Sequence, residues 1–208
     1  FMDTQPIDGP MGFKLEAPPL HPVILATTMP GYGQPHADLL AKFPHTHVLL
    51  ALLRDGFHPQ SEGGSIELAG DGTPIIDYVI NDYLWDGVRR SWLSMAEIQF
   101  AAGAKAVRAS HVDSPWFTSW EEAKAGINAL EFRSNAFTAG SAHCMGGLTM
   151  GEDQTRCLVD SNGKYHHLDN LYVFDGSVFP TSIGANPQLS IYGMACKQAN
   201  KLLETLKA

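Results

Sequence analysis

Apolar residues recur along the chain with two periods, and each period predicts one kind of element. Between Asp82 and Ala102 they return every three or four residues, which is typical of a helix with one apolar stripe. Asp82 is the expected N-cap of this helix. A second helix is predicted from Trp120 to Leu130, because Ser119 and Glu122 have the spacing of a capping box.

Shorter apolar segments predict strands. Gly12–Ala17 alternates between polar and apolar residues, and Thr46–Arg54 is a continuous apolar run that we interpret as a buried strand. Ser65–Leu68 and Ile75–Val79 flank a Gly-Asp-Gly turn and predict a hairpin. Lys105–Ala109 predicts a further strand. Strands followed by helices that cover one face indicate an α+β fold with an antiparallel sheet.

The pattern changes near Thr138, where short strands and glycine turns begin. The Asn162-Gly163 pair predicts a hairpin turn, and Leu171–Asp175 predicts a buried strand. A last helix is predicted to begin near Pro187. Its expected apolar face consists of Met194, Ala195, Ala199, Leu202, Leu203 and Leu206.

Composition and charge narrow the class of protein. The apolar fraction of 44% is that of a globular chain, and no run of about 18 apolar residues predicts a membrane span. The 14 basic and 22 acidic residues give a net charge of −8 with no basic stripe, which argues against nucleic acid as a partner. Cys144, Cys157 and Cys196 lack paired spacing and suggest free thiols in a reducing compartment.

Two segments of the C-terminal part carry candidate chemistry. Asn186-Pro187 is a helix start by local preference, and the first turn of a helix favours an anion or a carbonyl that gains negative charge. His143 lies among small residues, close to Gly146 and Gly147, where it could act as a general base. Taken singly, the two features are better explained as an ordinary capped helix and a structural histidine.

Taken together, these segments resemble one family. The order SAHCMGGLTMGED, LVDSNGKYHHLDNLYVFDGSVFPTS and IGANPQLSIYGMA is similar to the C-terminal segment of the glucose–methanol–choline (GMC) oxidoreductases. That family carries a His-x-Met-Gly segment, an Asn-Leu-Tyr-Val-x-Asp strand followed by Gly-Ser, and an Asn-Pro that starts a helix. The resemblance runs from about Ser141 to Leu203. Gly147 stands where many members have Thr.

The resemblance implies a catalytic pair. His143 matches the histidine that takes the hydroxyl proton of an alcohol, and Asn186 matches its partner, which is His in some members. Oxidation of an alcohol removes a proton from oxygen and a hydride from carbon, and FAD is the implied hydride acceptor. A carboxamide at a helix start can cap the helix through its oxygen while its NH₂ donates to the substrate oxygen.

The same resemblance implies flavin contacts. Asp175 and Gly176 match the strand end that contacts the ribityl and phosphate portion of FAD. Asn186, Pro187 and Gln188 match the helix start beneath the pyrimidine edge of the flavin ring, where negative charge develops on reduction. The positive end of a helix stabilises that charge without reorganising.

The resemblance also implies a division of the chain. Residues 1–140 are expected to form part of a substrate-binding domain, with an antiparallel sheet backed by helices. Residues 141–208 are expected to be the catalytic segment that completes an FAD-binding α/β domain. Segments such as WLSMAEIQFAAGAKAV suggest members that act on long-chain or other bulky alcohols.

A Gly-x-Gly-x-x-Gly turn for the FAD pyrophosphate is not found. Gly31-Tyr32-Gly33 is the nearest stretch, but position 36 is His and no strand precedes it. We therefore expect a C-terminal portion of a longer or split enzyme, whose partners are an alcohol substrate and an N-terminal FAD-binding portion. The alternatives are a non-catalytic module that binds a ligand or stabilises a partner, and a cyanohydrin lyase of the same family.

The remaining histidines support weaker alternatives. His45 and His47 would share one face of a strand and could form half of a metal site, but no third ligand is evident. His166 and Asp169 also resemble a ligand cluster, although a solvated loop is favoured there. Cys144 beside His143 is not placed as a Cys/His nucleophile, because adjacent side chains seldom face each other. No metal is predicted.

Overall fold

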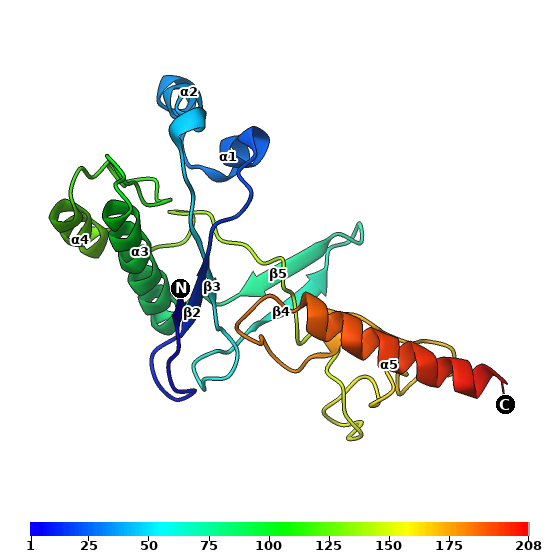
Figure 1. Ribbon diagram of the computed structural model, residues 1–208. Helices are drawn as coiled ribbons and strands as arrows, with labels where there is room; N and C mark the ends of the chain where they lie inside the picture. Colours follow the sequence, from blue (N-terminus) through cyan, green and yellow to red (C-terminus); the bar gives the residue numbers. More distant parts are fainter. Residues whose placement is uncertain (208) are drawn as a thin grey trace. The chain divides into compact units, whose positions relative to one another are not determined.

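A small antiparallel sheet forms where the sequence alternates. It consists of β1 (Met2–Asp3), β2 (Phe13–Glu16) and β3 (Leu50–Leu53), in the order β1-β2-β3 (Figure 1). Phe13 and Leu15 are buried, as expected for alternate residues on the inner face of a strand. The predicted strand over Gly12–Ala17 is therefore confirmed.

The apolar run Thr46–Arg54 is a strand only from Leu50 to Leu53, and these four residues are half-buried. The prediction of a longer buried strand is wrong because of the pairing partner. Phe13 pairs with Leu53 and Glu16 with Leu50, so β2 offers only four positions for ladder hydrogen bonds. Residues 46–49 form no regular element, and the short 3-10 helix η1 (Phe43–His45) precedes them.

One long helix covers this sheet, and a second helix packs against the first to enclose the main core. Helix α3 (Asp82–Ala101) contacts β2 and β3 on one side and α4 (Trp120–Ala129) on the other. The core between α3 and α4 is made of Ala96, Ala109, Phe117, Ala123 and Ile127. The structure is a computed structural model that describes residues 1–207, and its helices and antiparallel strands confirm the α+β class.

The helix caps agree with the predictions for α4 and differ for α3. Ser119 Oγ accepts the N–H of Glu122 at the start of α4, as predicted. At α3 the cap is Asn81 and not Asp82, because the Asn81 side chain accepts the N–H of Leu84. Asp82 lies in the first turn, where its charge complements the positive end of the helix.

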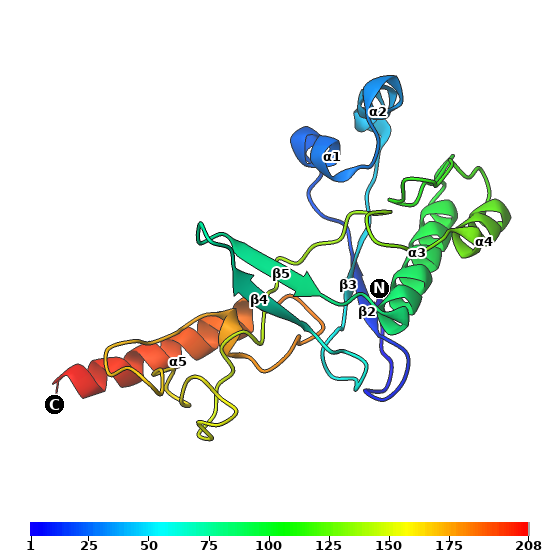
Figure 2. The same cartoon turned by 180° about the vertical axis from the view of Figure 1, so that it is seen from behind.

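The predicted hairpin is formed by β4 (Gly64–Leu68) and β5 (Pro74–Tyr78), seen from behind in Figure 2. All ten residues are exposed. Two further helices, α1 (Pro22–Thr28) and α2 (Gly33–Ala41), pack against each other, and His36 Nε2 lies 3.0 Å from the carbonyl oxygen of Ala26.

The C-terminal part contains few regular elements. Its elements are the 3-10 helix η2 (Gly176–Val178) and helix α5 (Gln188–Lys207), and the loops that precede η2 are linked by single β-bridges. The Asn162-Gly163 turn is confirmed, because Gly163 has φ 78° and Val159 pairs with Tyr165 across it. Only Gln198 of α5 is buried, while Leu203 and Leu206 of its predicted apolar face are exposed.

Two predicted strands are absent as strands. Leu171–Asp175 makes a single bridge, between Tyr172 and Lys164, and is not buried. Lys105–Ala109 likewise makes one bridge, between Val107 and Phe117. An apolar run becomes a strand only where a neighbour supplies a continuous ladder, and each segment has one paired position.

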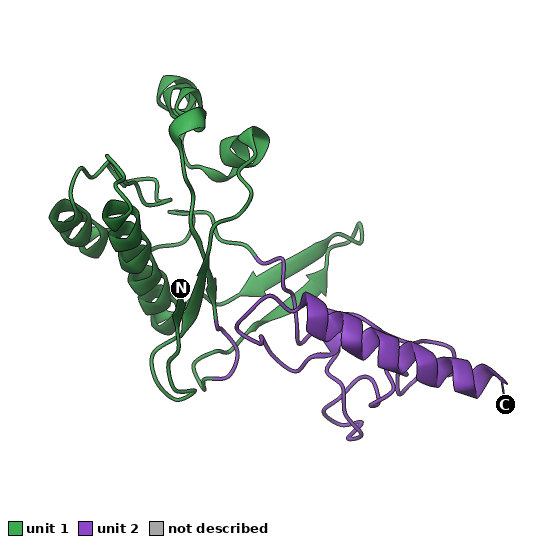
Figure 3. Cartoon of the chain, in the orientation of Figure 1, with its two compact units in different colours: residues 1–53, 58–140 green, residues 54–57, 141–208 purple. Residues whose placement is uncertain are grey.

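The chain divides into two compact units (Figure 3). Unit 1 comprises Phe1–Leu53 and His58–Gly140, and unit 2 comprises Arg54–Phe57 together with the chain from Ser141 onward. The boundary after Gly140 coincides with the predicted division, whereas Arg54–Phe57 joins the later unit. The assignment of the two parts to substrate binding and flavin contact stays a prediction. Within residues 1–207, no helix combines the length and apolar character needed to cross a bilayer.

Candidate functional site

His143 lies in an irregular, glycine-rich segment of unit 2 and is half-buried. Its backbone N–H donates to Ser141 Oγ at 3.0 Å, which fixes the local turn. Within residues 1–207, its two ring nitrogens make no hydrogen bond to another residue of the chain. The imidazole is therefore available to a ligand, as a general base must be.

The segment that follows His143 lies alongside η2. Leu148 N–H donates to the carbonyl oxygen of Ser177, and Met150 N–H donates to that of Val178, both at 3.0 Å. Gly146 has φ 85°, a conformation that glycine adopts without strain. These backbone bonds hold the His143 segment against the residues that follow Asp175.

Asp175 and Gly176 form the start of η2. The Asp175 carboxylate accepts the backbone N–H and the hydroxyl of Ser177 through Oδ1, and so caps this 3-10 helix. Gly176 is buried, and a Cβ added to it would lie 3.1 Å from the carbonyl oxygen of Cys144 and 3.1 Å from Ile191 Cδ1. A Cβ at this position would be tighter than most real contacts, so glycine favours the close approach of the two segments.

Asn186, Pro187 and Gln188 lie at the beginning of α5. Pro187 is buried and its carbonyl oxygen accepts the N–H of Ile191 at 2.9 Å, so the predicted helix start near Pro187 is confirmed. Asn186 is exposed, and Gln188 Nε2 donates to the hydroxyl of Tyr192 at 2.7 Å. Gln188 and the next two residues are all exposed, so the first turn of α5 faces outward.

A segment distant in sequence supports the loop that carries Asn186. A Cβ on Gly56 would lie 1.8 Å from Thr181 Oγ1, and a Cβ on Gly184 would lie 2.7 Å from Arg54 Cγ. Sequence reasoning missed this contact, because nothing local in Arg54–Phe57 indicates that it packs against residues 181–184. The glycines in both segments are the only signal that could have suggested a close approach.

The structure thus brings the predicted segments to one place through Gly176. This glycine contacts Cys144, the neighbour of His143, and Ile191, which lies five residues after Asn186 in the chain. All of these residues belong to unit 2. The direct approach of the His143 imidazole to the Asn186 carboxamide stays a prediction.

Two acidic residues follow Gly151 and are held by local hydrogen bonds. Hydrogen bonds from the side chain and backbone of Ser161 hold the pKa of Glu152 below its usual value, and hydrogen bonds from Thr155 do the same for the pKa of Asp153. The bond from Ser161 N–H to Glu152 Oε1 measures 3.1 Å. It ties the loop after Gly151 to the Asn-Gly turn.

The other histidines make contacts within the fold. His111 is fully buried, and its Nδ1 accepts the N–H of Asp113 while its Nε2 lies 3.1 Å from the carbonyl oxygen of Glu131, so it is a structural residue. His47 contacts the Gln99 side chain, and His166 contacts the carbonyl oxygen of Gly151. In the described part of the chain, no group of three or more His, Cys, Asp or Glu residues is placed to hold a metal ion. The three cysteines are free, as expected.

Comparison with known proteins agrees with this geometry. A family profile described as GMC oxidoreductase matches residues 59–195, which is well over half of the chain. Together with the α+β fold, this match defines the class of protein. The chain belongs to the GMC oxidoreductase family.

The similar proteins include several oxidases. The 6'''-hydroxyparomomycin C oxidase of Streptomyces lividus is 37% identical over 84 residues, or 40% of this chain and 15% of that protein. The long-chain-alcohol oxidase FAO4A of Arabidopsis thaliana is 25% identical over 201 residues, or 93% of this chain and 26% of that protein. The paromamine 6'-oxidase of Streptomyces fradiae is 36% identical over 76 residues, or 36% of this chain and 14% of that protein. The chain thus spans about a quarter or less of the length of these relatives.

Proposed function

We propose that this chain carries the proton-transferring and flavin-contacting residues of an enzyme that oxidises an alcohol to a carbonyl with FAD. The observation that carries the proposal is the close packing at Gly176, which joins the His143 segment to the first turn of α5. Family membership supports the same reaction class. Convergence of a base and a polar partner on one substrate oxygen is what alcohol oxidation requires.

His143 is proposed to accept the hydroxyl proton. Its imidazole is half-buried and makes no hydrogen bond within residues 1–207, so a substrate hydroxyl can reach a ring nitrogen. Histidine titrates near neutral pH, which suits a base that must take up and release a proton in each turnover. Partial removal of the proton gives the oxygen alkoxide character and weakens the C–H bond that is broken.

Asn186 is proposed to orient the same hydroxyl. A carboxamide has both a donor and an acceptor, so it can hold an oxygen whose proton is being transferred to a neighbouring base. The next residue, Pro187, is buried, and the preceding loop at residues 181–184 packs against residues 54 and 56. A rigid support of this kind preserves the geometry on which the rate depends.

The residues at the start of α5 fit the flavin ring. The first turn is exposed, and the N-terminal end of a helix carries a partial positive charge that suits a ring edge gaining negative charge. Pro187 and Gln188 would lie under this edge. Asp175 has Oδ1 committed to Ser177, which leaves Oδ2 for a ribityl hydroxyl. When bound, FAD supplies the hydride acceptor.

The alcohol is proposed to be long-chain or otherwise bulky. The similarity to FAO4A covers 93% of the chain and so includes nearly all of residues 1–140, the proposed substrate side. The similarity to the two Streptomyces oxidases covers only 40% and 36% of the chain. Substrate-side similarity therefore favours the long-chain alcohol over an aminoglycoside.

Anaerobic mixing of the FAD-loaded holoenzyme that contains this chain with 1-dodecanol tests the proposal. We expect the absorbance of oxidised flavin to bleach in a single turnover, with a larger second-order rate constant of bleaching for 1-dodecanol than for ethanol or paromamine. A holoenzyme that binds FAD and does not bleach with any alcohol would contradict the reaction. Conversion of a cyanohydrin without bleaching would identify a lyase instead.

A further inference from the structure

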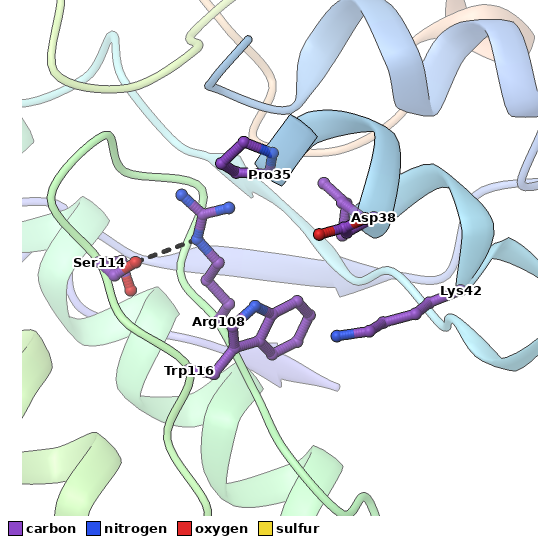
Figure 4. Close-up of a pocket in the computed structure, with 7 residues that line it drawn as sticks. Pro35, Asp38, Lys42, Arg108, Ser114 and Trp116 are labelled. Carbon is purple, nitrogen blue, oxygen red and sulfur yellow. Dashed lines mark hydrogen bonds between the residues drawn. The ribbon is translucent and has the colours of Figure 1, made fainter. Parts of the chain in front are cut away.

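A cavity of about 330 Å³ lies within unit 1 (Figure 4), whereas the residues assigned above belong to unit 2. One wall is a face of α2, and the other is the loop from Arg108 to Trp116, which precedes α4. Its volume is at the lower end of the range for ligand sites, roughly 300–1,000 Å³. A fragment-sized molecule fits such a space.

The loop wall follows from one antiparallel bridge. Val107 and Phe117 exchange backbone hydrogen bonds of 2.9 and 2.8 Å, and Phe117 is buried in the core against α4. Successive residues in extended chain point to opposite sides. Arg108 and Trp116 therefore lie next to each other on the side of the bridge away from the core, and Trp116 is 44% exposed.

The helical wall follows from the period of α2. Pro35, Asp38 and Leu39 recur at steps of three and four residues, and Lys42 continues this face just after the helix ends. Leu39 is buried and gives the cavity an apolar floor. Asp38 and Lys42 are exposed and stand at its rim.

The charges of this cavity are not paired with each other. Arg108 Nε donates to the carbonyl oxygen of Ser114 at 3.0 Å, and Lys42 Nζ lies 5.2 Å from the centre of the Trp116 ring. In the described part of the chain, neither cation makes an ion pair with a carboxylate. In Figure 4, the side chains of Asp38, Lys42, Arg108 and Trp116 point into the same space. Two cations against one carboxylate leave a net positive charge beside an indole face.

We propose that this cavity binds a small organic anion, in which a carboxylate or phosphate group is attached to a flat apolar group. The bond from Nε to Ser114 orients the guanidinium and leaves the two terminal nitrogens of Arg108 to face the anionic group. Lys42 adds a second positive charge. The apolar part of the ligand lies against Trp116 and Leu39. The site does not depend on the proposed alcohol chemistry, because none of its residues belongs to that machinery.

Calorimetric titration of the chain with benzoate, phenyl phosphate and benzyl alcohol tests the site. We expect both anions to bind with a 1:1 stoichiometry, to shift the indole N–H resonance of Trp116 and to bind at least about 10-fold more tightly than neutral benzyl alcohol. The tighter of the two anions identifies the anionic group that the site prefers. Binding of benzyl alcohol as tightly as the anions, or no heat from either anion at 10 mM, would overturn the proposal.

Variants assign the binding to named residues. Arg108→Gln and Lys42→Gln should each weaken anion binding, Arg108→Gln by about 10-fold or more, while Lys124→Gln on α4 removes an equal charge elsewhere and should leave it unchanged. Lys42 is exposed, so its variant keeps the test valid if Arg108→Gln unfolds. Trp116→Leu should weaken phenyl phosphate but not inorganic phosphate. Unchanged affinity in both cation variants would exclude the site.

Discussion

Gly176 is the residue on which the packing of the candidate site depends. It is surrounded by the carbonyl oxygen of Cys144 and the end of the Ile191 side chain, whereas Gly147, in the same unit, has nothing within 4 Å of a Cβ position. Gly147 also lacks a positive φ. The two glycines therefore form a matched pair, one in a crowded and one in an open environment.

Gly176→Ala should lower the free energy of unfolding by roughly 1–3 kcal/mol, because the backbone oxygen of Cys144 cannot move aside as a side chain can. Gly147→Ala should change it by no more than about 1 kcal/mol, and toward greater stability, because alanine restricts the unfolded chain. Urea denaturation measures both. Equal destabilisation by the two substitutions would show that crowding at Gly176 is not what holds the segments together.

For single residues, the sequence predicts the local backbone conformation better than it predicts which residues lie nearby in space. Asn186-Pro187 predicts a helix start and Asn162-Gly163 a turn, because both depend on the preferences of two adjacent residues. A tryptophan such as Trp116 suggests a core or pocket-wall residue, but the residues of α2 that line its pocket could not be predicted, since they come from a distant part of the sequence. Its exposure follows from the single bridge between Val107 and Phe117, which leaves Trp116 on the side away from the core.

Helices and strands were predicted with unequal success. Helices α3 and α4 begin and end within one residue of the predicted positions, because their signals, apolar spacing and caps, lie inside the helix itself. Strand length depends on a partner elsewhere in the sequence. Leu171–Asp175 and Lys105–Ala109 have the apolar character of strands but only one bridged position each.

The stability of the start of helix α4 depends on pH through the carboxylate of Glu122. The Glu122 carboxylate accepts hydrogen bonds from the backbone N–H of Thr118 at 2.8 Å and from its hydroxyl at 2.9 Å. These bonds lower the pKa of Glu122 from its ordinary value of 4.5. Because the folded pKa is the lower one, the stabilisation is present above pH 4.5 and is lost as the pH falls below it.

We therefore expect Glu122→Gln to be less stable than the wild type at pH 7, with the difference shrinking as the pH falls below 4.5. The midpoint of urea denaturation, measured from pH 7 to pH 3, reports this difference. Glu121→Gln is the control, because it removes the same charge from the same first turn. A gap between wild type and Glu122→Gln that is independent of pH would contradict the role of the carboxylate.

The two units of the molecule differ in how they bury apolar residues. Unit 1 contains the sheet, α3, α4 and most of the buried hydrophobic residues, whereas within residues 1–207 the buried hydrophobic residues of unit 2 are Val159 and Val178. Helices α3 and α5 each have 20 residues, yet only Gln198 of α5 is buried. The two helices have the same length, but α3 buries more of its residues than α5.

Amide hydrogen exchange should show this contrast directly. We expect the amides of α3 to be protected by opening free energies close to that of global unfolding, and those of α5 to exchange faster through local opening. Binding of a partner or of FAD to the exposed side of α5 should slow its exchange. Equal protection of α3 and α5 in the chain alone would contradict the difference in packing.

The central claim for the whole molecule is that His143 and Asn186 act on one substrate oxygen. A double-mutant cycle in the FAD-loaded holoenzyme tests this claim through kcat/KM with 1-dodecanol, and His167→Ala is the control for loss of an exposed histidine. His143→Ala should reduce turnover by roughly 10²–10⁴. If the two residues act together, adding Asn186→Ala to His143→Ala should cost much less than Asn186→Ala costs alone. Losses that simply multiply, or a His143→Ala variant as fast as His167→Ala, would contradict the account.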